Sequence, residues 1–478
     1  MKYEKYLYNR QYIIGSRFPD NFQGWKKENI GELCILAHRN LEIIKKAKAD
    51  TEIIILGYIF DGKNKDNDKK GIITELSLSK TFRELEDRFE YLAGRYLIIA
   101  KINDKIRIYP DAAGQRSCFY GCGWIASQPD LIAEIEKLKI NRKKTGEFLS
   151  HKTANAWIGT ITPYDEINML LPNHYLDIND FKPKRFWPVD KPKEIDVNSG
   201  LKIIVEALGN IIKNASKRHK LWLAFSGGYD SRIIFTSSRD LHDKIDYFVI
   251  RDENTPAYDI EIPKKICSVY GLDFRIIDYV KPDREWLELY DRNVCKLIWG
   301  LSRKKSKTYN NFPNDIMILK GHISTVGRAL YYQNGYIYKK ITPKLISRFM
   351  NYKNNRIALD EIKRWFDEFP YKHNNTLTMD FALMELSLGS WQSMECLGSE
   401  TNYCVFSPYN CRKIIETLLA INKKYKIYPH RLYHLMSDLT CPEIKEIPMN
   451  QESWIQSYTK KAKYLIQSLN EKLSILNS

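Results

Sequence analysis

The sequence predicts an α/β protein of two domains, residues 1–190 and residues 191–478. A chain of 478 residues is long for one domain, so two hydrophobic cores are the natural expectation. In the first part, apolar segments flank short polar turns, which is typical of antiparallel strands. In the second part, short apolar segments alternate with helical patterns, which is typical of a parallel sheet covered on both faces.

The first part is expected to be rich in strands. Apolar runs and turn residues predict a buried strand over 53–60, a helix over 82–92, and a hairpin with strands over 94–100 and 106–109. Prolines and charged residues around 190–200 predict a linker to the second part.

The second part begins with an amphipathic helix over 201–216, whose apolar residues share one face. The patterns that follow predict strands over 221–225, 247–250, 274–277 and 316–319, a helix over 258–270, and C-terminal helices over 379–391 and 413–421. Open parallel sheets bind ligands beyond the carboxyl ends of their strands, so we expect the functional site at that edge.

One such strand end carries the glycine-rich loop Ser226-Gly227-Gly228-Tyr229-Asp230-Ser231, followed by a helical pattern. The two glycines let the backbone approach an anion, and the helix offers unpaired N–H groups and the positive end of its dipole. Asp230 would repel a phosphate unless a cation lay between them, which favours Mg²⁺. A plain tight turn between strand and helix is the alternative interpretation.

The loop resembles the pyrophosphate loop, Ser-Gly-Gly-x-Asp-Ser, of enzymes that cleave ATP between the α and β phosphates. Residues 94–120, with Tyr109-Pro110-Asp111 and Gly114-Gln115-Arg116, and residues 158–176 are similar to the N-terminal domain of the asparagine synthetase-like family. This family of amide ligases includes beta-lactam synthetases and lasso-peptide cyclases. The resemblance implies an N-terminal Ntn-hydrolase-like sandwich of sheets and helices, then a parallel-sheet ATP pyrophosphatase domain with a helical C-terminal part.

In that family a substrate carboxylate attacks the α-phosphate of ATP, and an amine then displaces AMP. The resemblance implies ATP and Mg²⁺ as cofactors, Asp230 as the metal ligand and a catalytic residue, and these ATP-binding residues: Phe225, Ser226, Gly227, Gly228, Asp230, Ser231, Ile250 and Gly321.

Three features depart from the family. The glutaminase domain needs Cys at position 2, where this chain has Lys2, so this domain is expected to be degenerate. The acidic second loop, Gly-Glu-Gly-x-Asp-Glu, reads Gly321-His322-Ile323-Ser324-Thr325-Val326 here and lacks a carboxylate. The lysine that assists amide formation falls in register with Met449 or Asn450.

Several side chains near the predicted site have two interpretations each. His322 is a candidate catalytic acid or base, or a solvated loop residue. Asp259 and Glu261 either touch substrate or lie on a solvated helix face. Glu385 and Glu395 either orient a substrate amine or have capping or surface roles. A last group is expected to pack beside the second loop, namely Arg328, Tyr331 and Tyr332.

Composition limits the remaining classes of function. The net charge of +17 favours either an RNA partner or a Lys-rich proteome, and the lysines are spread rather than gathered, which makes nucleic acid the less favoured partner. The nine cysteines lack metal-site spacing, which favours a reducing cytoplasm. No apolar run is long enough for a membrane span.

The sequence therefore favours an AMP-forming ligase that adenylates a small-molecule or peptide carboxylate and passes it to ammonia or another amine, without its own glutaminase activity. A nucleotide-binding homologue that has lost catalysis is the alternative, and an RNA-modifying pyrophosphate-loop enzyme is a third. The sequence leaves a homodimer open.

Overall fold

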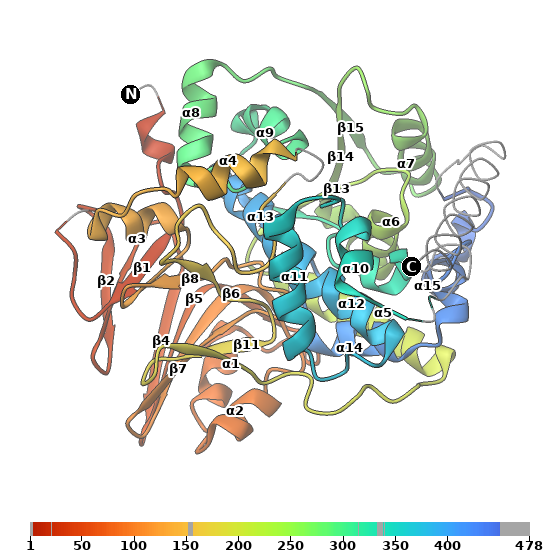
Figure 1. Cartoon of the computed structure of the whole chain (residues 1–478). Coiled ribbons are helices and arrows are strands. Elements are labelled where there is room, and N and C mark those ends of the chain that lie inside the picture. Colours follow the sequence, from red (N-terminus) through yellow and green to blue (C-terminus); the bar gives the residue numbers. More distant parts are fainter. Residues whose placement is uncertain are drawn as a thin grey trace, which may run out of the picture.

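A computed structural model of the chain describes residues 3–20, 22–151, 156–313, 315–331, 338 and 340–449. Across these residues the strands form three sheets, two antiparallel and one parallel. Figure 1 shows the antiparallel sheets together in the N-terminal part, in red to yellow, with the parallel sheet and most helices in the later part of the chain. The predicted α/β class is confirmed.

The two antiparallel sheets have six strands each and pack face to face. Ile14 and Ile35 on one sheet share a buried core with Ile54 and Leu97 on the other. The first sheet has the order β10 (Asn168–Met169), β8 (Phe119–Gly121), β9 (Trp124–Ala126), β1 (Tyr12–Gly15), β3 (Leu33–Ala37), β2 (Lys26–Ile30). The second has the order β12 (Lys182–Arg185), β11 (His174–Asp177), β7 (Lys105–Pro110), β6 (Leu92–Ile102), β5 (Thr51–Asp61), β4 (Ile43–Lys48).

The predicted strand and hairpin lie in the second sheet, as β5 and as the antiparallel pair β6–β7. Side chains of a strand alternate between its faces, so β5 also presents Ile53 and Ile55 to the outer face of this sheet. There they pack against Ile72 and Leu85 of the covering helices α1 (Lys69–Leu76) and α2 (Phe82–Asp87). Two more helices belong to this part, α3 (Pro129–Glu136) and α4 (Arg142–Ser150).

The parallel sheet positions the candidate site. Its order is β15 (Phe274–Asp278), β14 (Ile245–Arg251), β13 (Lys220–Ala224), β16 (Ile316–Leu319), β17 (Cys404–Phe406). From β13 the chain builds outward through β14 and β15, and then returns to place β16 on the other side of β13. The strand order therefore reverses between β13 and β16, and a ligand crevice is expected beyond the carboxyl ends of these two strands.

Helices surround this sheet (Figure 1). Their bounds are α5 (Val197–Ser216), α6 (Tyr229–Ser237), α7 (Tyr258–Val269), α8 (Arg284–Asn293), α9 (Leu301–Lys305), α10 (Pro343–Phe349), α11 (Arg356–Glu368), α12 (Asn375–Ala382), α13 (Ser393–Ser399), α14 (Arg412–Ala420) and α15 (Arg431–Thr440). The predicted helix over 379–391 falls on the last residues of α12 and on the π-helix that follows it, Leu383–Gln392. The three-residue strand β17 was not predicted, because so short an apolar run carries little pattern.

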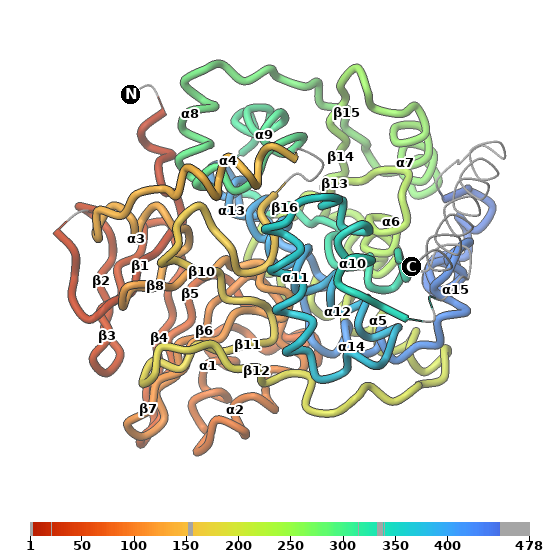
Figure 2. The backbone as a smooth tube through the Cα atoms, in the orientation of Figure 1, coloured from red at the N-terminus to blue at the C-terminus, as the bar shows by residue number. Residues whose placement is uncertain are grey.

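The expected linker falls between β12 and α5, and Figure 2 follows it in yellow along the edge of the molecule. The exact boundary between residues 190 and 191 stays a prediction. Within the ranges given above, no helix is long and apolar enough to cross a lipid bilayer.

Candidate functional site

The glycine-rich loop joins the carboxyl end of β13 to the first turn of α6. Its two serines close it: the Ser226 N–H donates to Ser231 Oγ at 3.2 Å, and Ser231 Oγ donates to the Ser226 carbonyl at 3.3 Å. The Gly228 N–H lies 3.4 Å from Ser226 Oγ. The backbone at the start of α6 is thereby fixed in a conformation that exposes helix N–H groups to an anion.

A carboxylate already contacts this loop. The Gly227 N–H donates to Asp259 Oδ1 of α7 at 3.0 Å. Burial raises the pKa of Asp259, while the hydrogen bond from Gly227 and the charge of Lys305 oppose that rise. The loop thus binds an oxygen anion from within the protein, and a nucleotide phosphate that used the Gly227 N–H would replace Asp259 there.

Asp230 is held between the second loop and the C-terminal part. Its Oδ2 accepts a hydrogen bond from Arg328 Nη2 at 2.9 Å, and its carbonyl accepts from the Tyr409 hydroxyl at 3.3 Å. Its Oδ1 is buried and has no hydrogen-bond partner in the described part of the chain. Gly321 presses against the same residue, since a Cβ at Gly321 would lie 2.4 Å from Asp230 Cβ.

These contacts test the predicted Mg²⁺. At a nucleotide site magnesium is usually held by one or two carboxylates together with phosphates and water, so the state of the Asp230 carboxylate decides the test: one of its oxygens is buried from solvent and the other is paired with a cation. Asp259 is bonded to the loop, and Asp252 lies 3.3 Å from Lys305 Nζ. In the described ranges, no group of three His, Cys, Asp or Glu side chains could hold a metal. The residues present do not fit a protein-held Mg²⁺, and Asp230 as its ligand stays a prediction.

A cluster of charged side chains lies at the carboxyl end of β16. Glu395 Oε1 is 2.9 Å from Lys320 Nζ, and Glu395 Oε2 is 3.5 Å from His322 Nε2. Burial alone would lower the pKa of His322, but the Glu395 carboxylate outweighs burial and raises it from 6.5 to about 9. The same balance raises the pKa of Lys320 and lowers that of Glu395. At neutral pH all three are charged, with a net charge of +1.

Replacing Glu395 with Gln is expected to lower the pKa of His322 well below about 9, because burial is then opposed only by the weaker contact with Cys396. Titration of the imidazole signals by NMR measures the shift. In the wild-type protein the raised pKa adds stability that is complete below pH 6.5 and is lost as pH rises through about 9. An unchanged His322 titration in the variant would show that Glu395 does not set its charge.

The cluster borders a small polar cavity of about 120 Å³, enough for about four water molecules or one small polar group. Lys320 and Glu395 line it together with Lys305 and Tyr403. The Tyr403 hydroxyl is buried and has no hydrogen-bond partner among the residues described. The cavity therefore offers lysine cations to a polar ligand beside β16.

Sequence reasoning named His322 and Glu395 but missed Lys320 and Lys305. A signal for Lys320 existed, since it directly follows a strand whose four residues are all buried. Lys305 lies on a short helix that carried no pattern.

The two predicted adenosine contacts, Phe225 and Ile250, lie in the hydrophobic core. The Phe225 side chain is 1% exposed and stacks on Phe235, with ring centroids 5.1 Å apart. Ile250 is 8% exposed in β14. Both side chains are almost entirely buried, and their contact with adenosine stays a prediction.

The remaining candidates differ in what they contact. Glu385 accepts hydrogen bonds from Arg185 Nη1 at 2.6 Å and Trp365 Nε1 at 2.7 Å, and Glu261 is exposed on α7. Arg328 pairs with Asp230 rather than only packing. Tyr331 packs against Phe349, whereas Tyr332 lies outside the described residues.

The segment expected to carry the amide-forming lysine lies against α6. Arg232 of α6 donates to the carbonyls of Ile444 at 2.8 Å and Pro448 at 3.0 Å. Met449 in this segment is buried, and Asn450 lies outside the described residues.

The predicted loss of glutaminase chemistry rests on Lys2, which is outside the described residues. Residues 1–190 contain three cysteines, Cys34, Cys118 and the exposed Cys122, and two of them are buried or partly buried in the sandwich. Cys34 pairs with Gly15 across two strands, and burial raises the pKa of Cys118 to about 12. Neither is placed at the chain terminus that the family's nucleophile requires.

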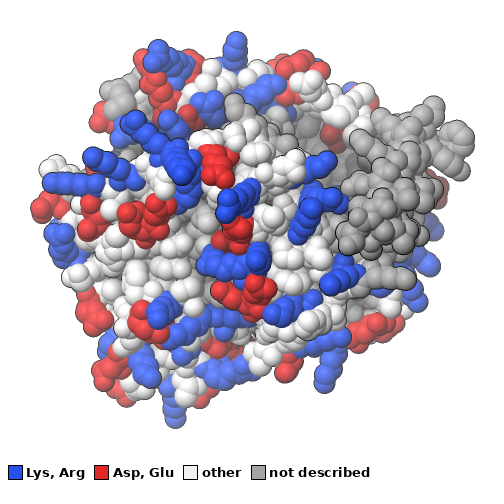
Figure 3. All heavy atoms as spheres, viewed as in Figure 1, with Lys and Arg blue, Asp and Glu red and all other residues white. Residues whose placement is uncertain are grey.

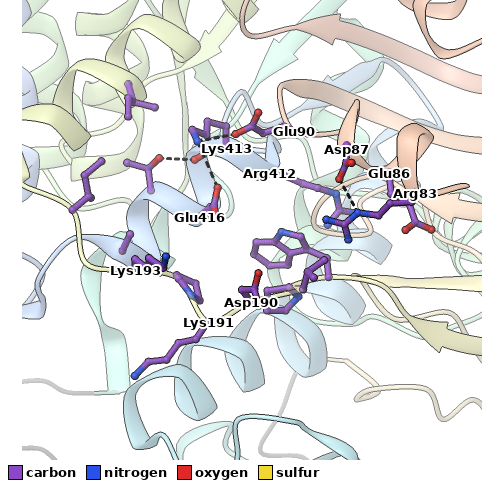
Figure 4. Close-up of a pocket in the computed structure, with 18 residues that line it drawn as sticks. Arg83, Glu86, Asp87, Glu90, Asp190, Lys191, Lys193, Arg412, Lys413 and Glu416 are labelled. Carbon is purple, nitrogen blue, oxygen red and sulfur yellow. Dashed lines mark hydrogen bonds and ion pairs between the residues drawn. The ribbon is translucent and has the colours of Figure 1, made fainter. Parts of the chain in front are cut away.

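A larger cavity of about 530 Å³ lies between α2, the linker and α14 (Figure 4). Some of its charged groups bind one another: Lys413 Nζ is 2.7 Å from Glu90 Oε1, and Arg83 Nε is 3.1 Å from Asp87 Oδ1. None of its lining residues belongs to the predicted nucleotide site.

The charged side chains are scattered over the surface, just as the lysines are scattered along the sequence. On the face shown in Figure 3, Lys and Arg side chains are interspersed with Asp and Glu. Surface charges are also paired directly, as in Lys217 with Asp66 at 2.6 Å. Among the described residues visible on this face, no extended basic tract of the kind that nucleic-acid backbones bind is present.

The sequence matches no protein-family model and no curated protein. Three solved structures align with it: glutamine phosphoribosylpyrophosphate amidotransferase from B. subtilis with ADP and GMP (10% identity, 67% of this chain and 71% of that chain, TM-score 0.24), an allosteric regulatory enzyme of purine biosynthesis (10%, 68% and 73%, TM-score 0.25), and glutamine-dependent NAD⁺ synthetase from Acinetobacter baumannii with ADP (11%, 50% and 61%, TM-score 0.16). Similarity at these TM-scores establishes neither a common fold nor a common activity.

Proposed function

We propose that this chain is an ATP-dependent, AMP-forming ligase that joins a carboxylate to an amine. One observation carries the proposal. The Ser226–Ser231 loop opens α6 at the point where the strand order reverses, and the Lys320–Glu395–His322 cluster lies at the end of the next strand. An anion-binding helix end and a cationic cluster beside a polar cavity are the groups that such a reaction needs.

The reaction balances in two steps. A carboxylate oxygen attacks the α-phosphorus of ATP, the bond to the bridging oxygen breaks, and pyrophosphate leaves. The amine nitrogen then attacks the acyl carbon, loses a proton, and AMP leaves. The loop and the start of α6 would bind the phosphates, while Lys320 and protonated His322 would attract the carboxylate into the cavity beside them.

The two domains would have different roles in this reaction. The parallel-sheet domain, 191–478, would carry the ligase site. The sandwich, 1–190, would serve as a degenerate glutaminase-like domain with a structural role, so that the amine comes from solution. Mg²⁺ enters this proposal only as a companion of the ATP phosphates, because no described residue set fits it.

A second candidate is a nucleotide-binding protein without ligase activity. The ion pair between Asp230 and Arg328 favours it, because it occupies the carboxylate that the family uses for metal. The buried Met449 near the position of the amide-forming lysine favours it too.

Exchange of labelled pyrophosphate into ATP tests the first candidate against the second. With the full chain and pools of amino acids, peptides and sugar acids, we expect exchange with at least one pool. Lys320→Met should slow that exchange about 10- to 100-fold, because a cation near the developing charge is lost. Thermal unfolding of the variant checks that it remains folded.

The control is Lys217→Met, which removes a lysine whose side chain is 46% exposed and which precedes the amino end of β13, the end opposite the loop. It should leave exchange unchanged. ATP binding without exchange in any pool would discard the ligase and leave the second candidate. A protein that does not bind ATP would discard both.

A further inference from the structure

Arg328 occupies the place at Asp230 that a metal ion would need. It ends the short helix η4 (Ser324–Arg328) of the second loop, which directly follows the carboxyl end of β16. Its side chain is 18% exposed, and its Nη2 lies 2.9 Å from Asp230 Oδ2. Asp230 stands in the first turn of α6, so the guanidinium is held beside the helix end that the loop opens.

The Arg328 guanidinium has hydrogen-bond donors that Asp230 does not use. It carries five N–H groups and cannot lose its charge at neutral pH. One nitrogen binds Asp230, and its Nε is buried without a hydrogen-bond partner in the described ranges. Arginine binds phosphate oxygens through paired N–H groups, so a phosphate at the start of α6 would meet a cation that is already oriented.

Asp230 itself is poorly placed as a metal ligand. Oδ1 is buried, Oδ2 is bonded to Arg328, and the Gly321 backbone lies close to Asp230, since a Cβ added at Gly321 would be 2.4 Å from Asp230 Cβ. The Asp230–Arg328 pair has no net charge, so it does not attract a divalent cation as an isolated carboxylate would.

We infer that Arg328, positioned by Asp230, binds the nucleotide phosphates in place of a protein-bound Mg²⁺. This inference rests on the proposed function, since it takes the ligand of the loop to be ATP. Arg328 is then a phosphate-binding residue, and Asp230 is a positioning residue whose carboxylate orients the guanidinium.

Calorimetric titration of the full chain with α,β-methylene-ATP, in Mg²⁺ and in EDTA, tests this. The wild-type affinity should differ by less than about threefold between the two conditions, since the guanidinium supplies the cation. Arg328→Gln should weaken binding about 10- to 100-fold in both, the usual effect of losing charge-assisted hydrogen bonds. Asp230→Asn should bind equally or more tightly, because it removes a negative charge and keeps an acceptor for Arg328.

The sign of the Asp230→Asn effect separates the two explanations, since loss of a true metal ligand would weaken binding in Mg²⁺. Arg328→Lys keeps the charge and covers a folding failure of Arg328→Gln, and it should retain an intermediate affinity. Arg284→Gln, on an exposed side chain, controls for net charge and should bind as the wild type does. Binding that requires Mg²⁺ and is lost in Asp230→Asn would overturn the inference alone, whereas no binding in either condition would overturn the proposed function as well.

Discussion

Replacing Glu400 with Gln is expected to lower the free energy of unfolding by about 3–5 kcal/mol. Glu400 follows α13, and its carboxylate is fully buried between the two parts of the chain. Its Oε2 lies 2.7 Å from Arg116 Nη1, and its Oε1 is paired with Arg95 of β6. Both guanidinium groups are fully buried too, so the variant leaves two desolvated cations without their counter-charge.

Chemical denaturation at neutral pH measures the loss. Glu288→Gln is the matched control, since its partner Arg284 is 92% exposed and solvent replaces the ion pair. The control should unfold as the wild type does. A Glu400→Gln variant with the same stability as this control would show that the buried ion pairs do not hold the two parts together.

The same pair predicts the response to acid. Burial alone would raise the pKa of Glu400, but Arg116 and Arg95 outweigh burial and lower it below 4.5. A lowered pKa in the folded state contributes stability that is complete above pH 4.5 and is lost as pH falls through the folded value. Between neutral pH and pH 4.5, the difference in stability between wild type and Glu400→Gln should stay constant, and from pH 4.5 down to the folded pKa of Glu400 the difference should shrink.

Local patterns in the sequence were sufficient for most of the fold. The strands β13 and β16 and the helix α5 were predicted within a few residues, because each combines an apolar run or stripe with a clear turn or charged boundary. The loop was placed correctly for the same reason, since strand, glycines and helix are consecutive in the chain.

The contacts that shape the site could not be read from local patterns. Asp259 meets Gly227 across 32 residues, Lys320 meets Glu395 across 75, and Arg328 meets Asp230 across 98. Each depends on how helices and loops pack over the sheet edge. The absence of a carboxylate from the second loop was visible in the sequence, but the arginine that neutralises Asp230 was visible only in the fold.

Replacing Gly321 with Ala is expected to weaken nucleotide binding about 10- to 100-fold, because moving the helix end breaks charge-assisted hydrogen bonds to the phosphates. The added Cβ would lie 2.4 Å from Asp230 Cβ and 3.0 Å from the Asp230 carbonyl carbon. Both atoms belong to the rigid first turn of α6 rather than to the end of a flexible side chain. The helix end must therefore move away from β16, which separates the loop from Lys320 and His322.

Two measurements on Gly321→Ala distinguish a displaced site from a wrong ligand. Calorimetry with α,β-methylene-ATP reports the loss of binding, and denaturation should show a cost of about 1–3 kcal/mol for overpacking. Gly146→Ala is the matched control, because Gly146 lies in α4 with nothing within 4 Å of an added Cβ. That variant should bind normally and be no less stable.

If Gly321→Ala lost stability but kept full affinity, the nucleotide would not depend on the contact between β16 and α6. If it lost neither, the two segments would not approach each other as closely as the structure places them.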